Sequence, residues 1–514
     1  MSVEPTHPQF ESPFERSTVE LPAAAPSADE PVAPVVAQAP RFPRLSPVIT
    51  WFAGTILLFA GALFLWLMWS SAGLGRVTAP DAALHLLASR SLDLQDAMAQ
   101  APRWEQVWSD WTSGDSAAER AELLRWYEEL VTHLRQEEGR GDAQVELQLA
   151  ILRAEVGHTK RTEWQLQSWD RRPAPFPMYA RLVQVAYANE GATRGELKDL
   201  QAIAVDALPA GWFYERVAMR LATRAGDESL MASITALGAE RRSALLNRSR
   251  VLTVIQLVCI VVGLFVVVRI VRRGTVRPWL LVGRSTQPPP WPGWLGVHVL
   301  IRGAAVGAAV MWLAISFGVD HPLLRLATIP ATNVALLWFA WRCLIQPLPA
   351  EQRDVFGLVP LSASGRRLAA AVFVLVAAGL LGEWVLGRLG ETLGLTSHWS
   401  EWFDGDLVWG APAVVATSVM EYVILAPIFE ELAFRGLLFS TLRRRWSFRG
   451  AAFVSAGLFA LAHGYGILGF LGVFWSGLLW AWSAERTGSL LPGMIAHAIN
   501  NLFVCLGVLA LLRW

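Results

Sequence analysis

Apolar segments long enough to cross a lipid bilayer recur along most of this chain of 514 residues. A helix needs about 20 mostly apolar residues to span the hydrocarbon core. Hydrophobic residues make up 54% of the sequence and charged residues only 17%, a balance typical of membrane proteins rather than soluble domains. We predict an all-α, polytopic membrane helix bundle of about nine spans, at residues 48–74, 251–271, 295–317, 323–346, 367–390, 409–439, 450–466, 468–484 and 490–512.

Two regions lie outside this pattern. Residues 1–47 are rich in Pro, Ala, Glu and Ser and poor in apolar clusters, which predicts a disordered tail. Residues 75–249 are mostly polar but keep a helical period, as in the i, i+4, i+7 stripe Trp104, Trp108 and Trp111. We expect an all-α extramembrane domain there, inserted between the first and second spans. The predicted order is a tail, a first transmembrane helix, this domain, further transmembrane helices and a last membrane domain with the motifs below, at residues 1–47, 48–74, 75–249, 250–408 and 409–514.

The positions of the arginines predict how the chain crosses the membrane. Loops on the cytoplasmic side carry an excess of Lys and Arg. If the amino terminus is cytoplasmic, most arginines of the short loops lie inside, including Arg272, Arg273 and the run from Arg443 to Arg445. The domain at 75–249 is then extracytoplasmic, and we expect a multi-pass protein of a bacterial inner membrane. A net charge of +1 gives no electrostatic reason to expect a nucleic-acid partner.

Ionisable and amide side chains interrupt the apolar segments in the last fifth of the chain. A charged side chain at the centre of a bilayer costs roughly 2.5–3.5 kcal/mol on insertion scales, so such residues usually serve a function. Counted from the nearest basic edge at about 1.5 Å per residue, the glutamates and histidines lie about 16 to 21 Å deep, which places them in one layer. The residues are Glu430, Glu431, Arg435, His463, His497 and Asn501.

Helical spacing predicts which of these side chains cooperate. Glu431 and Arg435 are four residues apart and are expected to pair, which leaves Glu430 free to face a cavity. The histidine and the asparagine of the last segment are also four residues apart and share one helix face. Pro427 lacks an N–H and is expected to kink its helix, which would make room for water.

This set of groups suits hydrolysis of a peptide bond. An unpaired Glu430 can take a proton from water and pass it to the leaving amine, while His463 holds the same water. His497 and Asn501 can donate hydrogen bonds to the oxyanion. A carboxylate and two histidines also suit zinc with an open position for water, so Glu430, His463 and His497 are candidate metal ligands. The residues leave metal-free and zinc-assisted water open, and no other cofactor is indicated.

Three short motifs occur in order on these segments: EExxxR at Glu430–Arg435, FxxxH at Phe459–His463 and HxxxN at His497–Asn501. With the preceding turn at Arg486–Leu490, they resemble the CAAX-prenyl-endopeptidase-like and bacteriocin-processing membrane proteins, known as CPBP intramembrane proteases, over residues 409–512. The resemblance implies a glutamate-type intramembrane endopeptidase.

The resemblance also implies a role for each matching residue. Glu430 would be the catalytic base, and His463 would help to activate the water. His497 and Asn501 would form the oxyanion pocket. The residues that support the first helix would be Glu431 and Arg435.

We therefore expect an enzyme that hydrolyses a peptide bond of a membrane-associated peptide or of a membrane-anchored protein tail. Its partners would be that substrate and the lipid bilayer, with the domain at 75–249 recruiting a substrate or a further partner. Two alternatives stay open. A non-catalytic membrane immunity or adaptor protein would keep its function without Glu430 and His463. A proton-coupled transporter would also use buried carboxylates and histidines, although no inverted repeat is visible.

Overall fold

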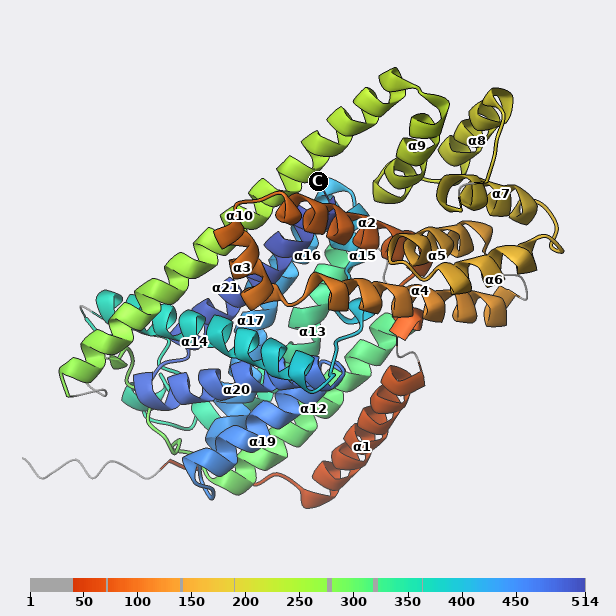
Figure 1. The fold of residues 1–514 in the computed structure, drawn as a ribbon. Helices are drawn as coiled ribbons and strands as arrows, with labels where there is room; N and C mark the ends of the chain where they lie inside the picture. Colours follow the sequence, from red (N-terminus) through yellow and green to blue (C-terminus); the bar gives the residue numbers. More distant parts are fainter. Residues whose placement is uncertain are drawn as a thin grey trace, which may run out of the picture. The chain divides into compact units, whose positions relative to one another are not determined.

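The structure is a computed structural model that describes residues 40–70, 73–138, 142–188, 190–274, 280–317, 322–362 and 364–513. Every regular element in these residues is a helix (Figure 1), which confirms the predicted all-α class. Most of the predicted tail, residues 1–39, lies outside the described residues. The first helix, α1, begins at Pro47, and all elements below belong to the compact unit Phe42–Trp514.

Eight of the described helices are long and apolar enough to cross a membrane, which confirms a polytopic bundle. The ninth predicted span, at residues 450–466, is instead α19 (Phe448–Leu461), a helix of 14 residues. At about 1.5 Å per residue, α19 rises about 21 Å and falls short of a hydrocarbon core of about 30 Å. The eight are α1, α10, α12, α13 with η2, α14, the continuous helix from α16 to α18, α20, and α21 with η7, at Pro47–Leu67, Glu228–Arg272, Gly293–Ser316, Leu326–Ile345, Gly365–Thr392, Pro412–Leu442, Ile467–Thr487 and Leu491–Arg513.

The helix at Pro412–Leu442 contains two stretches of widened, π-helical turns. They are η5 (Glu421–Leu425) and η6 (Glu431–Phe439), and the short segment α17 (Ala426–Glu430) separates them. Pro427 in that segment has no N–H to donate, and its ring crowds the preceding turn. The distortion expected there takes the form of these widened turns, which are frequent at functional sites.

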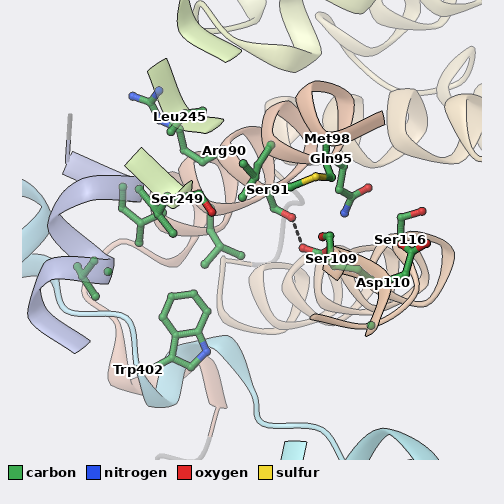
Figure 2. Close-up of a pocket in the computed structure, with 18 of the residues that line it drawn as sticks. Arg90, Ser91, Gln95, Met98, Ser109, Asp110, Ser116, Leu245, Ser249 and Trp402 are labelled. Atoms are coloured by element: carbon green, nitrogen blue, oxygen red, sulfur yellow. Dashed lines mark hydrogen bonds between the residues drawn. The ribbon is translucent and has the colours of Figure 1, made fainter. Parts of the chain in front are cut away.

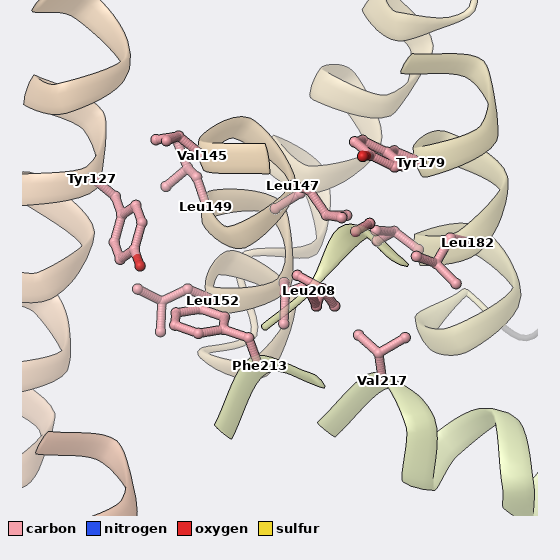
Figure 3. Packing of buried hydrophobic residues seen from close by; sticks show 14 of the residues in the cluster. Tyr127, Val145, Leu147, Leu149, Leu152, Tyr179, Leu182, Leu208, Phe213 and Val217 are labelled. Carbon is pink, nitrogen blue, oxygen red and sulfur yellow. The ribbon is translucent and has the colours of Figure 1, made fainter. Parts of the chain in front are cut away.

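Helices α2 and α4 to α9 pack around one hydrophobic cluster (Figure 3), in which Tyr127, Leu152 and Phe213 are buried, and α3 packs on α2. Trp399 belongs to the same core, although it lies in η4 (Trp399–Glu401), in the segment that follows α14. We call this assembly the α2–α9 cluster, and its extramembrane position stays a prediction. Its helices are α2 (Pro80–Ala99), α3 (Arg103–Ser113), α4 (Ser116–Glu138), α5 (Ala143–Glu155), α6 (Thr159–Trp169), α7 (Phe176–Tyr187), α8 (Arg194–Ala207) and α9 (Trp212–Ala225).

The 45-residue helix α10 (Glu228–Arg272) packs on the α2–α9 cluster and on a membrane helix. In its first half, Arg241 Nε donates to Asp93 Oδ2 of α2 at 2.6 Å. In its second half, Gly263 approaches α14 so closely that a Cβ there would lie 2.3 Å from a side-chain carbon of that helix. Because no proline interrupts α10, the predicted boundary between residues 249 and 250 falls inside one continuous helix.

Candidate active site

Glu431 is the centre of a buried group of polar side chains. It is the first residue of η6, and its Oε1 atom accepts hydrogen bonds from Arg435 Nη1 at 2.9 Å and from His497 Nδ1 at 3.1 Å. Glu431, Arg435 and His497 are only 1%, 0% and 5% exposed. A charge in such surroundings is stable only when it is paired. The expected Glu431–Arg435 pair is therefore present, with His497 of α21 as its third member.

Aromatic rings hold the His497 imidazole in place. Trp480 of α20 stacks on it with ring centroids 5.7 Å apart, and Phe459 of α19 meets it at 5.9 Å in a T-shaped contact. The Arg435 guanidinium also lies over the Phe459 ring, with its central carbon 4.2 Å from the ring centroid. Because a carboxylate can only accept, His497 Nδ1 donates to Glu431. The ring orientation is thus set, and its Nε2 atom is left for other contacts.

The carboxylate of Glu430, in contrast, is open. Its side chain is 31% exposed, and its Oε2 atom lies 3.8 Å from His497 Nε2. Among the residues that the structure describes, no other basic or imidazole group pairs with this carboxylate, and none donates a hydrogen bond to it. A carboxylate without hydrogen bonds, next to an imidazole, is suited to binding and deprotonating water.

His463 lies in the turn between α19 and α20 rather than inside a helix. Its Nδ1 atom is bonded to the Phe459 carbonyl at 2.8 Å, and the two rings pack with centroids 4.8 Å apart. Since a carbonyl only accepts, Nδ1 carries the proton, and Nε2 is an acceptor in the neutral ring. His463 therefore joins the buried group through Phe459, and within the described chain it makes no ion-pair contact with Glu430.

Asn501 makes a contact with the backbone of the neighbouring helix. Its Nδ2 atom donates to the Tyr422 carbonyl in η5 at 2.8 Å. In this widened turn a carbonyl is bonded by the N–H five residues later, as Glu421 is by Ala426. The corresponding donor for Tyr422 would be Pro427, which has no N–H. One of the two N–H groups of the Asn501 amide replaces that missing donor, and the second N–H remains available for another acceptor.

The residues predicted as zinc ligands do not fit a metal site in the part of the chain that the structure describes. There, no group of three His, Cys, Asp or Glu side chains is arranged to hold a metal ion. Glu430 Oε2 and His497 Nε2 lie 3.8 Å apart, and the bond of His463 Nδ1 to the Phe459 carbonyl leaves Nε2 of that ring available, so the misfit lies in how the three side chains are placed. A catalytic zinc ion needs three protein ligands around one point.

A cavity of about 750 Å³ lies elsewhere, and none of the predicted site residues lines it (Figure 2). It is bordered by α2, α3, α10 and the end of α21. One wall is polar, with Arg90, Gln95 and Asp110, and another is apolar, with Phe503 and Leu512. The cavity lies between the α2–α9 cluster and membrane helices and is separate from the candidate active site.

The structure brings four of the six predicted site residues into one group: Glu430, Glu431, Arg435 and His497. Sequence reasoning did not single out Trp480, because it lies on another helix and no spacing rule relates it to His497. Its one signal in the sequence is its place well inside an apolar segment, whereas membrane tryptophans usually gather near the ends.

Residues 409–503 match the family model of the type II CAAX prenyl endopeptidase Rce1-like. This segment contains all three motifs, and the match supports intramembrane protease activity at the level of the family. No curated protein and no solved structure matches the chain. Residues 409–503 are therefore similar to the Rce1-like type II CAAX prenyl endopeptidases, consistent with the CPBP proteases that the motifs resemble, within a multi-pass membrane protein.

Proposed function

We propose that this protein hydrolyses a peptide bond within the membrane, with Glu430 as the general base. The difference between two adjacent glutamates carries the proposal. Glu431 is closed by Arg435 and His497, whereas Glu430 is 31% exposed and accepts no hydrogen bond from the described residues. The ion-paired group of Glu431, Arg435 and His497 fixes the helix and the imidazole ring, whereas the Glu430 carboxylate remains available to bind water.

In the proposed reaction, Glu430 removes a proton from water, and the resulting hydroxide attacks the peptide carbonyl carbon. The carbonyl oxygen becomes an oxyanion, and then the C–N bond breaks. The proton held by Glu430 passes to the leaving amine, so one water is consumed and a carboxylic acid and an amine are formed. The same carboxylate thus acts first as base and then as acid.

The other motif residues assist this step. The Nε2 atom of His463 would accept the second hydrogen of the water, because its Nδ1 proton is used by the Phe459 carbonyl. His497 would stabilise the oxyanion through Nε2–H in its protonated form, with Glu431 balancing the ring charge. The second N–H of the Asn501 amide would donate to the same oxyanion.

The substrate would be a membrane-associated peptide or a membrane-anchored protein tail. A peptide substrate and a bilayer follow at a general level from the apolar helices and the protease-family segment. The prenylated tails that give the family its name are one class to test. We place the protein in a bacterial inner membrane with its amino terminus cytoplasmic and the α2–α9 cluster outside, where this cluster would recruit a substrate or partner.

The test compares wild-type protein with Glu430→Gln, each in lipid vesicles with the membrane-peptide fraction of the producing cells. The wild type is expected to generate new carboxyl termini and the variant none, with unchanged thermal unfolding. Glu485→Gln is the matched control, because Glu485 near the end of α20 pairs with Arg443 at 2.9 Å and touches none of the motif residues. Cleavage by Glu430→Gln at the wild-type rate would refute the proposal.

The same preparations test the two alternatives and the metal. A cellular phenotype that survives Glu430→Gln, without any cleavage by the wild type, would identify an adaptor or immunity protein. Proton-coupled flux without cleavage would identify a transporter. Dialysis against a chelator is expected to leave the wild-type cleavage rate unchanged, and its loss with recovery on added zinc would establish metal-assisted water.

A further inference from the structure

The turn that carries His463 follows a helix too short to cross the membrane. Helix α19 begins soon after the run from Arg443 to Arg445 and rises only about 21 Å. Gly464 takes a φ of +63°, a left-handed conformation that ends a helix at little cost for glycine. The backbone carbonyls of this turn lie outside any helix, and at membrane depth the protein must supply their hydrogen-bond donors.

One such donor comes from the connection between α1 and α2. Arg76, the last residue of the short helix η1 (Gly73–Arg76), donates from Nη2 to the Gly464 carbonyl at 2.7 Å. In the same helix, Leu74 is 4% exposed and belongs to the hydrophobic core of the α2–α9 cluster. Helix η1 also packs on η4. The α2–α9 cluster is therefore bonded to the residue that directly follows His463.

Two more residues, Glu401 and Tyr465, surround this turn. Glu401 of η4 reaches the start of α20, where a Cβ on the glycine before the helix would lie 2.7 Å from its Oε1 atom. The Glu401 Oε2 atom is buried and accepts no hydrogen bond from the described residues. Tyr465 packs against the His463 ring at 5.7 Å and lies within electrostatic range of Arg76, Glu401 and Glu430. The contacts thus continue from the α2–α9 cluster to the edge of the candidate active site.

We propose that Arg76 is a positioning residue for His463, an inference that rests on the proposed function. Arg76 acts through the Gly464 carbonyl and so fixes the turn that sets where the His463 ring lies relative to Glu430. Docking of the α2–α9 cluster then shapes the site as well as recruiting a substrate. A displacement of about 1 Å in a reacting group costs as much as about 100-fold in rate, so one hydrogen bond to this turn has a measurable effect.

The experiment uses the full chain in vesicles and a peptide that the wild type cleaves. Arg76→Gln removes the guanidinium, and Gly464→Ala strains the turn without touching Arg76. Both variants are expected to lower kcat about 10- to 100-fold while KM stays within about twofold, in samples of equal folded fraction. Arg220→Gln is the control, because it breaks an ion pair with Glu155 at 3.0 Å inside the α2–α9 cluster, and it should leave both constants unchanged.

An unchanged kcat in Arg76→Gln, or an equal loss in Arg220→Gln, would overturn the positioning role. A fall in the folded fraction that accounts for all of the lost activity would overturn it as well. The Glu430→Gln variant separates this failure from that of the proposed function. If Glu430→Gln cleaves normally, the proposed function fails; if it is inactive while Arg76→Gln is normal, only the positioning role fails.

Discussion

Two buried glutamates, one in the α2–α9 cluster and one among the membrane helices, have closely similar surroundings. In the α2–α9 cluster, Glu146 is 0% exposed and accepts hydrogen bonds from Arg172 at 2.8 and 2.9 Å and from the Trp169 indole at 3.1 Å. The Arg172 guanidinium lies over the Phe176 ring. In the membrane, Glu431 pairs with an arginine that also lies over a phenylalanine ring. Each group combines a carboxylate, a guanidinium and an aromatic ring.

The two ion pairs differ in the groups that surround them. Both oxygens of Glu146 are occupied, and a second arginine, Arg135, completes its surroundings. The membrane group instead has an imidazole as third member, and the second carboxylate, Glu430, lies open 3.8 Å from that ring. A closed ion-pair group contributes to stability and uniqueness of packing, whereas an open carboxylate next to one is available for chemistry. The surroundings of Glu430 therefore distinguish a candidate active site from a purely structural group.

The largest expected effect is that of Glu430→Gln. Loss of a general base typically lowers a rate by about 10²- to 10⁴-fold, so cleavage in vesicles should fall by that factor. The temperature of thermal unfolding should stay the same, because the Glu430 carboxylate accepts no hydrogen bond from the described residues. A large loss of stability with normal cleavage would mean that Glu430 belongs to the closed group.

Glu431→Gln should affect stability most. It leaves Arg435, which is 0% exposed, without a counter-charge, and breaking a buried pair costs about 3–5 kcal/mol. Denaturant unfolding in detergent measures this cost. The double variant Glu431→Leu, Arg435→Met should recover much of the stability but not the cleavage, because leucine offers no acceptor to the His497 Nδ1–H group. Recovery of both would show that the pair has no part in orienting the imidazole.

Glu146→Gln should destabilise the protein by less, about 1–3 kcal/mol. Its arginines Arg135 and Arg172 have side chains that are 53% and 27% exposed, so water can partly replace the lost partner. Cleavage per folded molecule should be unchanged. The readouts are denaturant unfolding and the cleavage rate corrected for the folded fraction. A reduced corrected rate would contradict the contrast between the two groups.

Asn501→Ala should have the smallest effect on stability, about 1 kcal/mol, because it removes one hydrogen bond to the Tyr422 carbonyl. Pro427→Ala restores a backbone N–H near that carbonyl, so the double variant should be more stable than Asn501→Ala alone. Cleavage should remain low in both, since neither supplies a donor to the oxyanion. Thermal unfolding and cleavage are measured for the wild type, Asn501→Ala and the double variant. Normal cleavage by Asn501→Ala would show that Asn501 only bonds the Tyr422 carbonyl and does not also donate to the oxyanion.

The class of fold could be predicted because long apolar segments have only one common solution in lipid, a helix that satisfies its own backbone. The helix ends were harder. The apolar run at 450–466 continues through residues that form a turn, with Gly464 in the left-handed region, so composition overestimated the length of the helix. The predicted boundary at residue 249 followed a change of polarity, but helix α10 contains no breaker there.

In the candidate site, too, sequence predicts some contacts and misses others. Glu431 and Arg435 could be paired from sequence, because four residues place them on one helical face. The contacts of Asn501 with Tyr422 and of Arg76 with Gly464 join segments far apart in the chain. No local period encodes such contacts, which depend on how the helices pack. Sequence therefore predicts the reacting groups better than the residues that hold them in place.

The most direct test of Glu430 as the base follows the oxygen of the attacking water. Purified protein in vesicles is incubated with its membrane-peptide substrates in water enriched in oxygen-18, and the products are analysed by mass spectrometry. We expect one heavy oxygen atom in each new carboxyl terminus made by the wild type, and no such products from Glu430→Gln. Equal amounts of labelled product from Glu430→Gln would contradict the assignment of this glutamate as the base.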